Sequence, residues 1–200
     1  MNKQEAINSL LGANNFFATQ SQGYKSWGNV NVLQVALRIS ASEFLVTDAN
    51  KRLEEITARD IQLQTSSATT FSQIFSSRKK INTILITQQE FASKLQEDVP
   101  AILDDQAQLL GVSIRHAKTE SQITKALSGR YAAILPDKKS ICLGTGIDDA
   151  YVAAQLLEKT SKVFIEAKHL GGAKAINKIE AWLMQQYYQF KYSKEAVKNR

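Results

Sequence analysis

The sequence has very few of the residues that build metal centres and disulfides. Its 200 residues include one cysteine, Cys142, and two histidines, His116 and His169. A single cysteine excludes an intrachain disulfide framework and is typical of a reducing compartment, so we expect a cytoplasmic protein. Zinc and iron sites take three or four ligands from histidine, cysteine and carboxylates, so one chain cannot build a histidine-rich catalytic centre. An all-oxygen site for Mg²⁺ or Ca²⁺ stays open.

Long apolar runs and structure-breaking residues are also scarce. No stretch of about 18 apolar residues is present that would predict a membrane span. The first residues, MNKQEAINSLLGANNFF, lack the unbroken apolar segment of a secretory signal. Two prolines and nine glycines exclude a collagen-like or proline-rich chain. Because no repeat or linker is visible, we predict one domain over residues 1–200.

The positive charge is spread along the chain. There are 25 basic and 19 acidic residues, a net charge of +6. The densest basic stretches are Arg78-Lys79-Lys80 and the tail with Lys191, Lys194, Lys198 and Arg200. Neither forms a block of five or six like charges, so we interpret them as solvated surface. A nucleic-acid partner is therefore the lowest-ranked of our hypotheses.

Hydrophobic spacing predicts interleaved helices and strands. The predicted helices cover residues 4–18, 69–77, 90–95, 104–110, 120–127, 147–170 and 173–192. The predicted extended segments cover 30–39, with a phase slip near residues 33–34, and 44–47, 81–86, 112–115, 131–135 and 140–143. The last two segments are joined by Pro136-Asp137-Lys138-Lys139, a short turn that favours antiparallel pairing. These patterns predict an α/β protein with helices packed on a mixed or antiparallel sheet.

Several stretches resemble class II aldolases of the fuculose-phosphate and rhamnulose-phosphate type, a family that includes the adducin head domain. They are AAILPDKKSICLGTGIDDAYVAAQLLEKTSKVFIEAKHLGG, LDDQAQLLG, FLVTDANKRLEEIT, GNVNV, and TSSATTFSQIF followed by INTILITQQ. The resemblance covers nearly the whole chain. It implies a three-layer α/β/α fold around a largely antiparallel sheet. It also implies a homo-oligomer, a cyclic tetramer in the family, with active sites between subunits.

The resemblance places the family's metal ligands on residues that do not suit a metal. The two histidines of its HxH motif correspond to Thr87 and Gln89, and the third histidine corresponds to Lys138. The acid/base glutamate corresponds to Ala68, and the loop that carries a proton-donating tyrosine corresponds to residues 116–119, which include none. Thr and Gln oxygens are weak neutral ligands, and a protonated lysine repels a cation. We therefore predict no metal cofactor and no metal-dependent aldol cleavage by the chain acting alone.

Some phosphate-binding positions of the family are matched. Asn29, Ser66 and Ser67 match, whereas Ala49 and Asn50 replace the family's Ser/Thr and Gly. One interpretation is an anion-binding remnant; the other is that the two serines cap the helix that begins near residue 69.

We consider three hypotheses for Lys138. It is a solvated turn lysine, or a cation that replaces the metal's charge and binds an anion, or a Schiff-base lysine, which would need a depressed pKa. Among the other candidates, His116 suits proton transfer near neutral pH. His169 fits a helix C-terminus, and Cys142 fits a buried strand.

The cluster Trp182, Tyr187, Tyr188, Phe190 and Tyr192 is interpreted as a helix packed on the domain or on another subunit rather than as a base-stacking platform.

The sequence thus predicts a metal-free, non-catalytic class II aldolase-like protein. It would bind a small anionic metabolite such as a sugar phosphate, through Asn29, Ser66, Ser67 and Lys138, or act through assembly. The alternative is a lyase or isomerase of altered chemistry that uses Lys138, His116 or Asp105. A homo-oligomer is expected, with no membrane partner.

Overall fold

A computed structural model of the chain describes residues 2–20, 28–65 and 69–198. Its helices are α1 (Lys3–Gln20), α2 (Thr70–Ser77), α3 (Ile123–Ala126), α4 (Ile147–His169) and α5 (Lys178–Lys198). Its strands are β1 (Val30–Arg38), β2 (Glu43–Thr47), β3 (Ile61–Thr65), β4 (Thr83–Gln89), β5 (Val99–Pro100), β6 (Ser113–His116), β7 (Ala132–Ile134) and β8 (Ser140–Gly144). Short turns of 3-10 helix are η1 (Leu53–Glu55), η2 (Ala58–Asp60), η3 (Ala92–Lys94) and η5 (Glu120–Gln122), and η4 (Gln106–Leu110) is a π turn.

The strands form one sheet with the order β3-β2-β1-β4-β8-β7-β6-β5. All neighbouring pairs are antiparallel except β6 and β7, which are parallel. The predicted α/β class with a largely antiparallel sheet is therefore confirmed. The predicted phase slip is confirmed as well, because the pairing of β1 with β4 shifts register between Val32 and Gln34.

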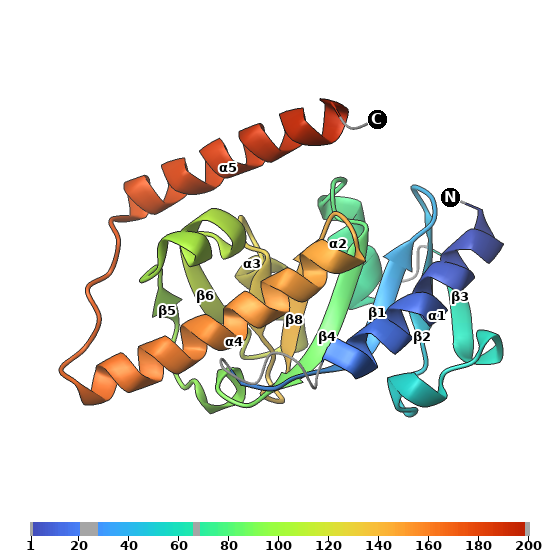
Figure 1. The fold of residues 1–200 in the computed structure, drawn as a ribbon, viewed down its shortest axis with the longest axis horizontal. Helices are drawn as coiled ribbons and strands as arrows, with labels where there is room; N and C mark the ends of the chain where they lie inside the picture. The colour runs from blue at the N-terminus through green and yellow to red at the C-terminus, as the bar shows by residue number, and fades with distance from the viewer. Residues whose placement is uncertain (1, 21–27, 66–68, 199–200) are drawn as a thin grey trace.

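Alternate residues of the central strands face two separate apolar clusters. On one side, Val35, Leu85 and Cys142 pack with side chains of α1 and α4. On the other side, Ala36 and Ile84 pack with side chains of α2 and α3. Figure 1 shows α1 and α4 lying across the same side of the sheet. This period-two burial is why the central strands contain nearly continuous apolar runs.

The long helix α4 has favourable charges at both of its ends. Asp148 and Asp149 lie in its first turn, and Lys168 and His169 lie in its last turn, where each charge is favoured by the helix dipole. Gly171 follows with φ +103°, a conformation that glycine adopts without strain.

Four predicted helices differ from the observed structure. The segment 120–127 begins as the 3-10 turn η5, and only Ile123–Ala126 form the helix α3. α5 begins at Lys178 rather than at 173, because Asn177 caps it: its Oδ1 accepts from the Ile179 N–H at 2.9 Å. Residues 90–95 form only the 3-10 turn η3, and the segment before Gly111 closes as the π turn η4. Propensity favours helix in both segments, but short connections take the geometry that tertiary contacts require.

No helix of the described residues is both long and apolar enough to cross a membrane.

Candidate functional site

The residues predicted to form a site lie at one end of the sheet. Gln89 ends β4 and pairs with Val30, which directly follows Asn29. On the other side of β4, Thr87 pairs with Ser140, which lies two residues after Lys138. Because adjacent strands are about 4.8 Å apart, Asn29 and Lys138 flank β4 at a separation of roughly 10 Å. The structure therefore brings Asn29, Thr87, Gln89 and Lys138 to a common edge.

Thr87 and Gln89 are closed into a buried hydrogen-bond chain. The Thr87 hydroxyl donates to Gln89 Oε1 at 3.1 Å, and Gln89 Nε2 donates to the Ala154 carbonyl of α4 at 2.6 Å. Thr87 is fully buried and Gln89 is 2% exposed. Both side chains therefore join the strand to the helix that covers it, instead of facing an open cleft.

The residues at the metal-ligand positions of the resemblance do not fit a divalent cation. The Gln89 oxygen already accepts a hydrogen bond, its nitrogen is a donor, and Lys138 would bring a positive charge. Among the described residues, no group of three or more His, Cys, Asp or Glu side chains is arranged to hold a metal. Beside Thr87, the buried Ser140 hydroxyl has no hydrogen-bond partner among those same residues.

Lys138 is an exposed turn residue. It lies between β7 and β8 with φ +64°, and its backbone N–H donates to the Leu135 carbonyl at 3.0 Å. Its neighbours Asp137 and Lys139 form an ion pair at 2.7 Å. This geometry agrees with the solvated-turn interpretation and leaves the ammonium group accessible to an anion.

The other predicted anion-binding positions give a mixed result. Asn29 is exposed, and its carbonyl accepts from the Glu90 N–H at 3.4 Å. Ser66, Ser67 and Ala68 lie outside the described residues. The helix cap next to them is Thr69, whose hydroxyl accepts from the Ser72 N–H at 3.3 Å. The N-cap of α2 is therefore Thr69 and not one of the two serines.

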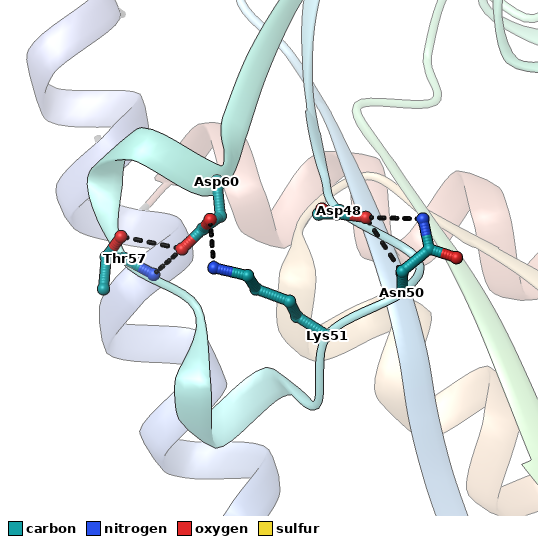
Figure 2. A network of polar contacts seen from close by, with 5 residues as sticks. All are labelled: Asp48, Asn50, Lys51, Thr57 and Asp60. Atoms are coloured by element: carbon teal, nitrogen blue, oxygen red, sulfur yellow. Dashed lines mark hydrogen bonds and ion pairs between the residues drawn. The ribbon is translucent and has the colours of Figure 1, made fainter.

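The turn after β2 is occupied by its own hydrogen bonds (Figure 2). Asp48 Oδ1 accepts from the backbone and side-chain nitrogens of Asn50 at 2.9 and 3.1 Å. Lys51 pairs with Asp60 at 2.6 Å, and the backbone N–H and hydroxyl of Thr57 donate to the same carboxylate. The Lys51 side chain holds the pKa of Asp60 at about 2, with help from Thr57. The carboxylates of Asp48 and Asp60 thus lie beside Ala49 and Asn50, and their negative charge disfavours phosphate at this turn.

Glu158 is the buried polar residue that sequence reasoning missed. This α4 side chain is fully buried, and its carboxylate accepts from the backbone N–H groups of Phe91 and Ala92 at 2.8 and 2.9 Å. Desolvation by burial raises the pKa of Glu158. The Glu158 side chain also explains why residue 28 is a glycine: a Cβ on Gly28 would lie 2.3 Å from Glu158 Oε1. The available signal was an acidic residue in the apolar stripe of α4, four residues after Ala154.

The remaining candidates have structural partners. His116 lies at the same end of the sheet, with Nε2 3.2 Å from the Leu95 carbonyl and Nδ1 3.4 Å from Asp98 Oδ1. Asp105 caps η4 and pairs with Lys159 at 2.5 Å. Cys142 is fully buried, which confirms its predicted place in the core, and desolvation raises the pKa of its thiol to about 12.

Solved structures of class II aldolases share this fold. An L-fuculose 1-phosphate aldolase superposes with a TM-score of 0.79 at 16% identity, over 94% of this chain and 98% of that one. The L-fuculose 1-phosphate aldolase from Glaciozyma antarctica PI12 gives 0.68 at 19% identity, over 91% and 80%. An aldolase II superfamily protein from Pseudomonas syringae gives 0.65 at 13% identity, over 94% and 86%. No protein-family profile and no curated protein matches the sequence. The predicted resemblance is confirmed at the level of fold: the chain has a class II aldolase-like fold.

Proposed function

We propose that this chain is a non-catalytic protein on the three-layer class II aldolase-like fold, and that it works by assembly with other polypeptide chains. The observation that carries the proposal is the hydrogen-bond chain from Thr87 through Gln89 to the Ala154 carbonyl. It places strand and helix in direct contact where the family's reaction needs metal ligands. Metal-dependent aldol cleavage needs a Lewis acid held by several ligands in an accessible cleft, and these side chains supply neither.

Assembly is favoured over catalysis by a second observation. The described part of the chain exposes large apolar side chains on α5, including Trp182 and Leu183 at 52% and 55%. Contiguous exposed apolar surface marks interaction sites in soluble proteins. The two observations together support the proposal of a non-catalytic protein that uses this surface for partners.

A small anion is the second candidate ligand. It is supported by the accessible Lys138 and Asn29 at one end of the sheet. We expect inorganic phosphate or L-fuculose 1-phosphate to raise the melting temperature of the wild type, and Lys138→Ala to reduce that shift. Lys139→Ala is the matched control, since Lys139 is held by Asp137. An equal shift in wild type and Lys138→Ala would remove this candidate.

The alternative of an enzyme with altered chemistry has less support. His116 and Asp105 are both held by structural contacts, and Lys138 is solvated rather than buried. A lysine that forms Schiff bases needs a desolvated or electrostatically shifted ammonium.

The test is a metal and activity measurement on the full chain. The protein is purified, dialysed against Zn²⁺ or Mn²⁺, analysed for bound metal, and assayed for cleavage of L-fuculose 1-phosphate. We expect no stoichiometric metal and no cleavage above the rate without protein. Tight metal binding at Gln89, or retro-aldol turnover that Gln89→Ala abolishes, would overturn the proposal.

A further inference from the structure

α5 is attached to the rest of the molecule through Ala181, Met184 and Gln185. Ala181 is fully buried and packs with Ala101 and Ala107. Gln185 is 3% exposed, and its Nε2 donates to the Gly129 carbonyl at 3.1 Å. Gly111 permits this approach, because a Cβ there would lie 2.9 Å from Gln185 Nε2. The position of α5 is therefore set by one face that contains Ala181, Gln185 and the partly buried Met184.

The opposite face of α5 carries the large apolar side chains. Ile179, Trp182, Leu183 and Tyr187 are 70%, 52%, 55% and 70% exposed. At 3.6 residues per turn these four residues form one stripe, centred about half a turn away from Ala181 and Gln185. We call this stripe the outer face. A helix that only packs on its own domain has the reverse arrangement, with its largest apolar side chains turned inward.

We propose that the outer face pairs with the outer face of α5 in a second copy of this chain, with the two helices antiparallel about a two-fold axis. This inference rests on the proposed function, because it names the partner in the assembly. In an isologous contact the same apolar stripe of the two subunits meets, so one surface per chain is enough to bury the stripe of both subunits.

The charges beside the stripe favour this partner and this orientation. Glu180 and Lys191 are eleven positions, about three turns, apart, so they lie on the same flank of the outer face. In an antiparallel two-fold pair, each flank runs beside the same flank of the other copy in the opposite direction. Glu180 then approaches Lys191 of the second copy, and the symmetry repeats the pair. In a parallel two-fold pair this flank would instead lie beside the opposite flank of the other copy, so Glu180 and Lys191 would not meet.

The size of the outer face sets the strength of the contact. Four large side chains per copy supply less than the ~1,200–2,000 Å² that stable interfaces bury in total. We therefore expect a reversible dimer whose population rises with protein concentration.

The first experiment is sedimentation velocity on the full chain over a hundredfold range of concentration. We expect the wild type to shift from monomer to dimer. Leu183→Glu places two charges in the apolar contact and should weaken dimerisation at least a hundredfold. Val152→Glu is the matched control, because Val152 is 44% exposed on α4, and should leave the dimer unchanged. Circular dichroism checks that each variant is folded.

The second experiment tests orientation by charge exchange. Glu180→Lys and Lys191→Glu should each weaken dimerisation about tenfold, since each replaces two attractive pairs by repulsive ones. The double variant E180K/K191E restores both pairs and should recover the wild-type constant. Failure of the double variant to recover would overturn the antiparallel arrangement.

The outcomes separate this inference from the proposed function. If the wild type associates and Leu183→Glu associates equally, assembly stands but occurs through another surface, and the present inference is wrong. A wild type that stays monomeric at every concentration overturns both the dimer and its part in the proposed function, whereas the metal and activity result is independent of it. Binding of the monomer to phosphatidylserine vesicles, lost in Leu183→Glu, would reassign the outer face to a membrane and overturn the dimer.

Discussion

At the scale of single residues, the candidate site depends on the hydrogen bonds that two buried polar side chains form. Gln89 and Glu158 both lie between the end of β4 and α4, and both are fully or almost fully buried. Gln89 ties the strand to the Ala154 carbonyl, and Glu158 ties the helix to the backbone after the strand. Buried polar groups are tolerated only when hydrogen bonded, so these residues hold the region closed.

The first prediction concerns Gln89→Ala. The variant leaves the Ala154 carbonyl without its donor and the Thr87 hydroxyl without its acceptor, both in the interior. We expect the free energy of unfolding to fall by about 2–4 kcal/mol, measured by urea denaturation. Gln88→Ala, on the exposed side of the same strand, should change it by less than about 0.5 kcal/mol. Equal effects of the two variants would mean that the hydrogen-bond chain does not hold β4 to α4.

The second prediction concerns the pH dependence contributed by Glu158. Burial raises the pKa of its carboxyl above the ordinary value of 4.5, so the folded state keeps the proton longer than the unfolded chain. Its contribution to stability is therefore largest below pH 4.5 and declines as pH rises through the folded pKa.

The measurement compares wild type with Glu158→Gln by denaturant unfolding from pH 4 to pH 8. The free energy of unfolding of the wild type, taken relative to the variant, should decrease over this range. Glu120→Gln, at an exposed position in η5, is the control and should follow the wild type. A relative stability that rises with pH would show that the three-residue turn η3 stabilises the carboxylate enough to reverse the sign.

At the scale of elements, the connection between β2 and β3 combines local polar contacts with apolar contacts to the core. η2 is closed by a capping box in which the Thr57 side chain and Asp60 satisfy each other's backbone groups. Lys51 reaches across to the same carboxylate from the turn after β2 (Figure 2). Local charge and capping therefore add to the burial of Leu53 and Ile56, which pack in the main apolar cluster.

The third prediction follows from the lowered pKa of Asp60. Its hydrogen bonds with Lys51 and Thr57 lower that pKa from 3.8 to about 2, so the folded state holds the carboxylate more strongly than the unfolded chain. The stabilising contribution is present above pH 3.8 and is lost as pH falls toward 2. An NMR titration of the Asp60 carboxyl carbon should show its midpoint near 2 in the wild type and a higher midpoint in Lys51→Met. Glu54→Gln, at an exposed position in η1, should leave that midpoint where it is.

At the scale of the whole molecule, the fold is shared with solved class II aldolases at low sequence identity. The superposition at a TM-score of 0.79 keeps the backbone frame although only 16% of residues are identical. Helices and strands need only the right apolar period and length, whereas a metal site needs particular side chains at particular positions. The frame can therefore persist after the reaction site has changed.

The fourth prediction uses that shared frame. A triple variant with Thr87→His, Gln89→His and Lys138→His places imidazoles at the three ligand positions that the resemblance identifies. We expect it to bind about one Zn²⁺ per chain, since three histidines and a water make a common zinc site. Bound metal is measured by elemental analysis after dialysis, with Gln88→His, Lys139→His and Thr83→His in one chain as the control. A folded triple variant that holds no zinc would show that the backbone at this end of the sheet no longer has the family's geometry.

Much of this molecule was determined by local sequence pattern. The apolar periods predicted α1, α4 and the irregularity in β1, because a helix or strand face is set by residues close together in the chain. The assignment of Thr87, Gln89 and Lys138 to the family's three ligand positions comes from the resemblance alone and stays a prediction. The boundaries of α5 and the conformation of η3 and η4 did not follow, because capping by Asn177 and contacts with distant helices decide them.

Only the tertiary structure decided which partners the buried side chains of Gln89 and Glu158 contact. Gln89 finds its partner on Ala154, 65 positions along the chain, and Glu158 caps a turn 67 positions before it. No local period carries such pairings, because they arise when α4 packs on β4 and water is removed from both. The same holds for α5, where the sequence shows an aromatic-rich helix. The side that faces outward depends on Ala181 and Gln185 occupying the small space beside Gly111 and Gly129.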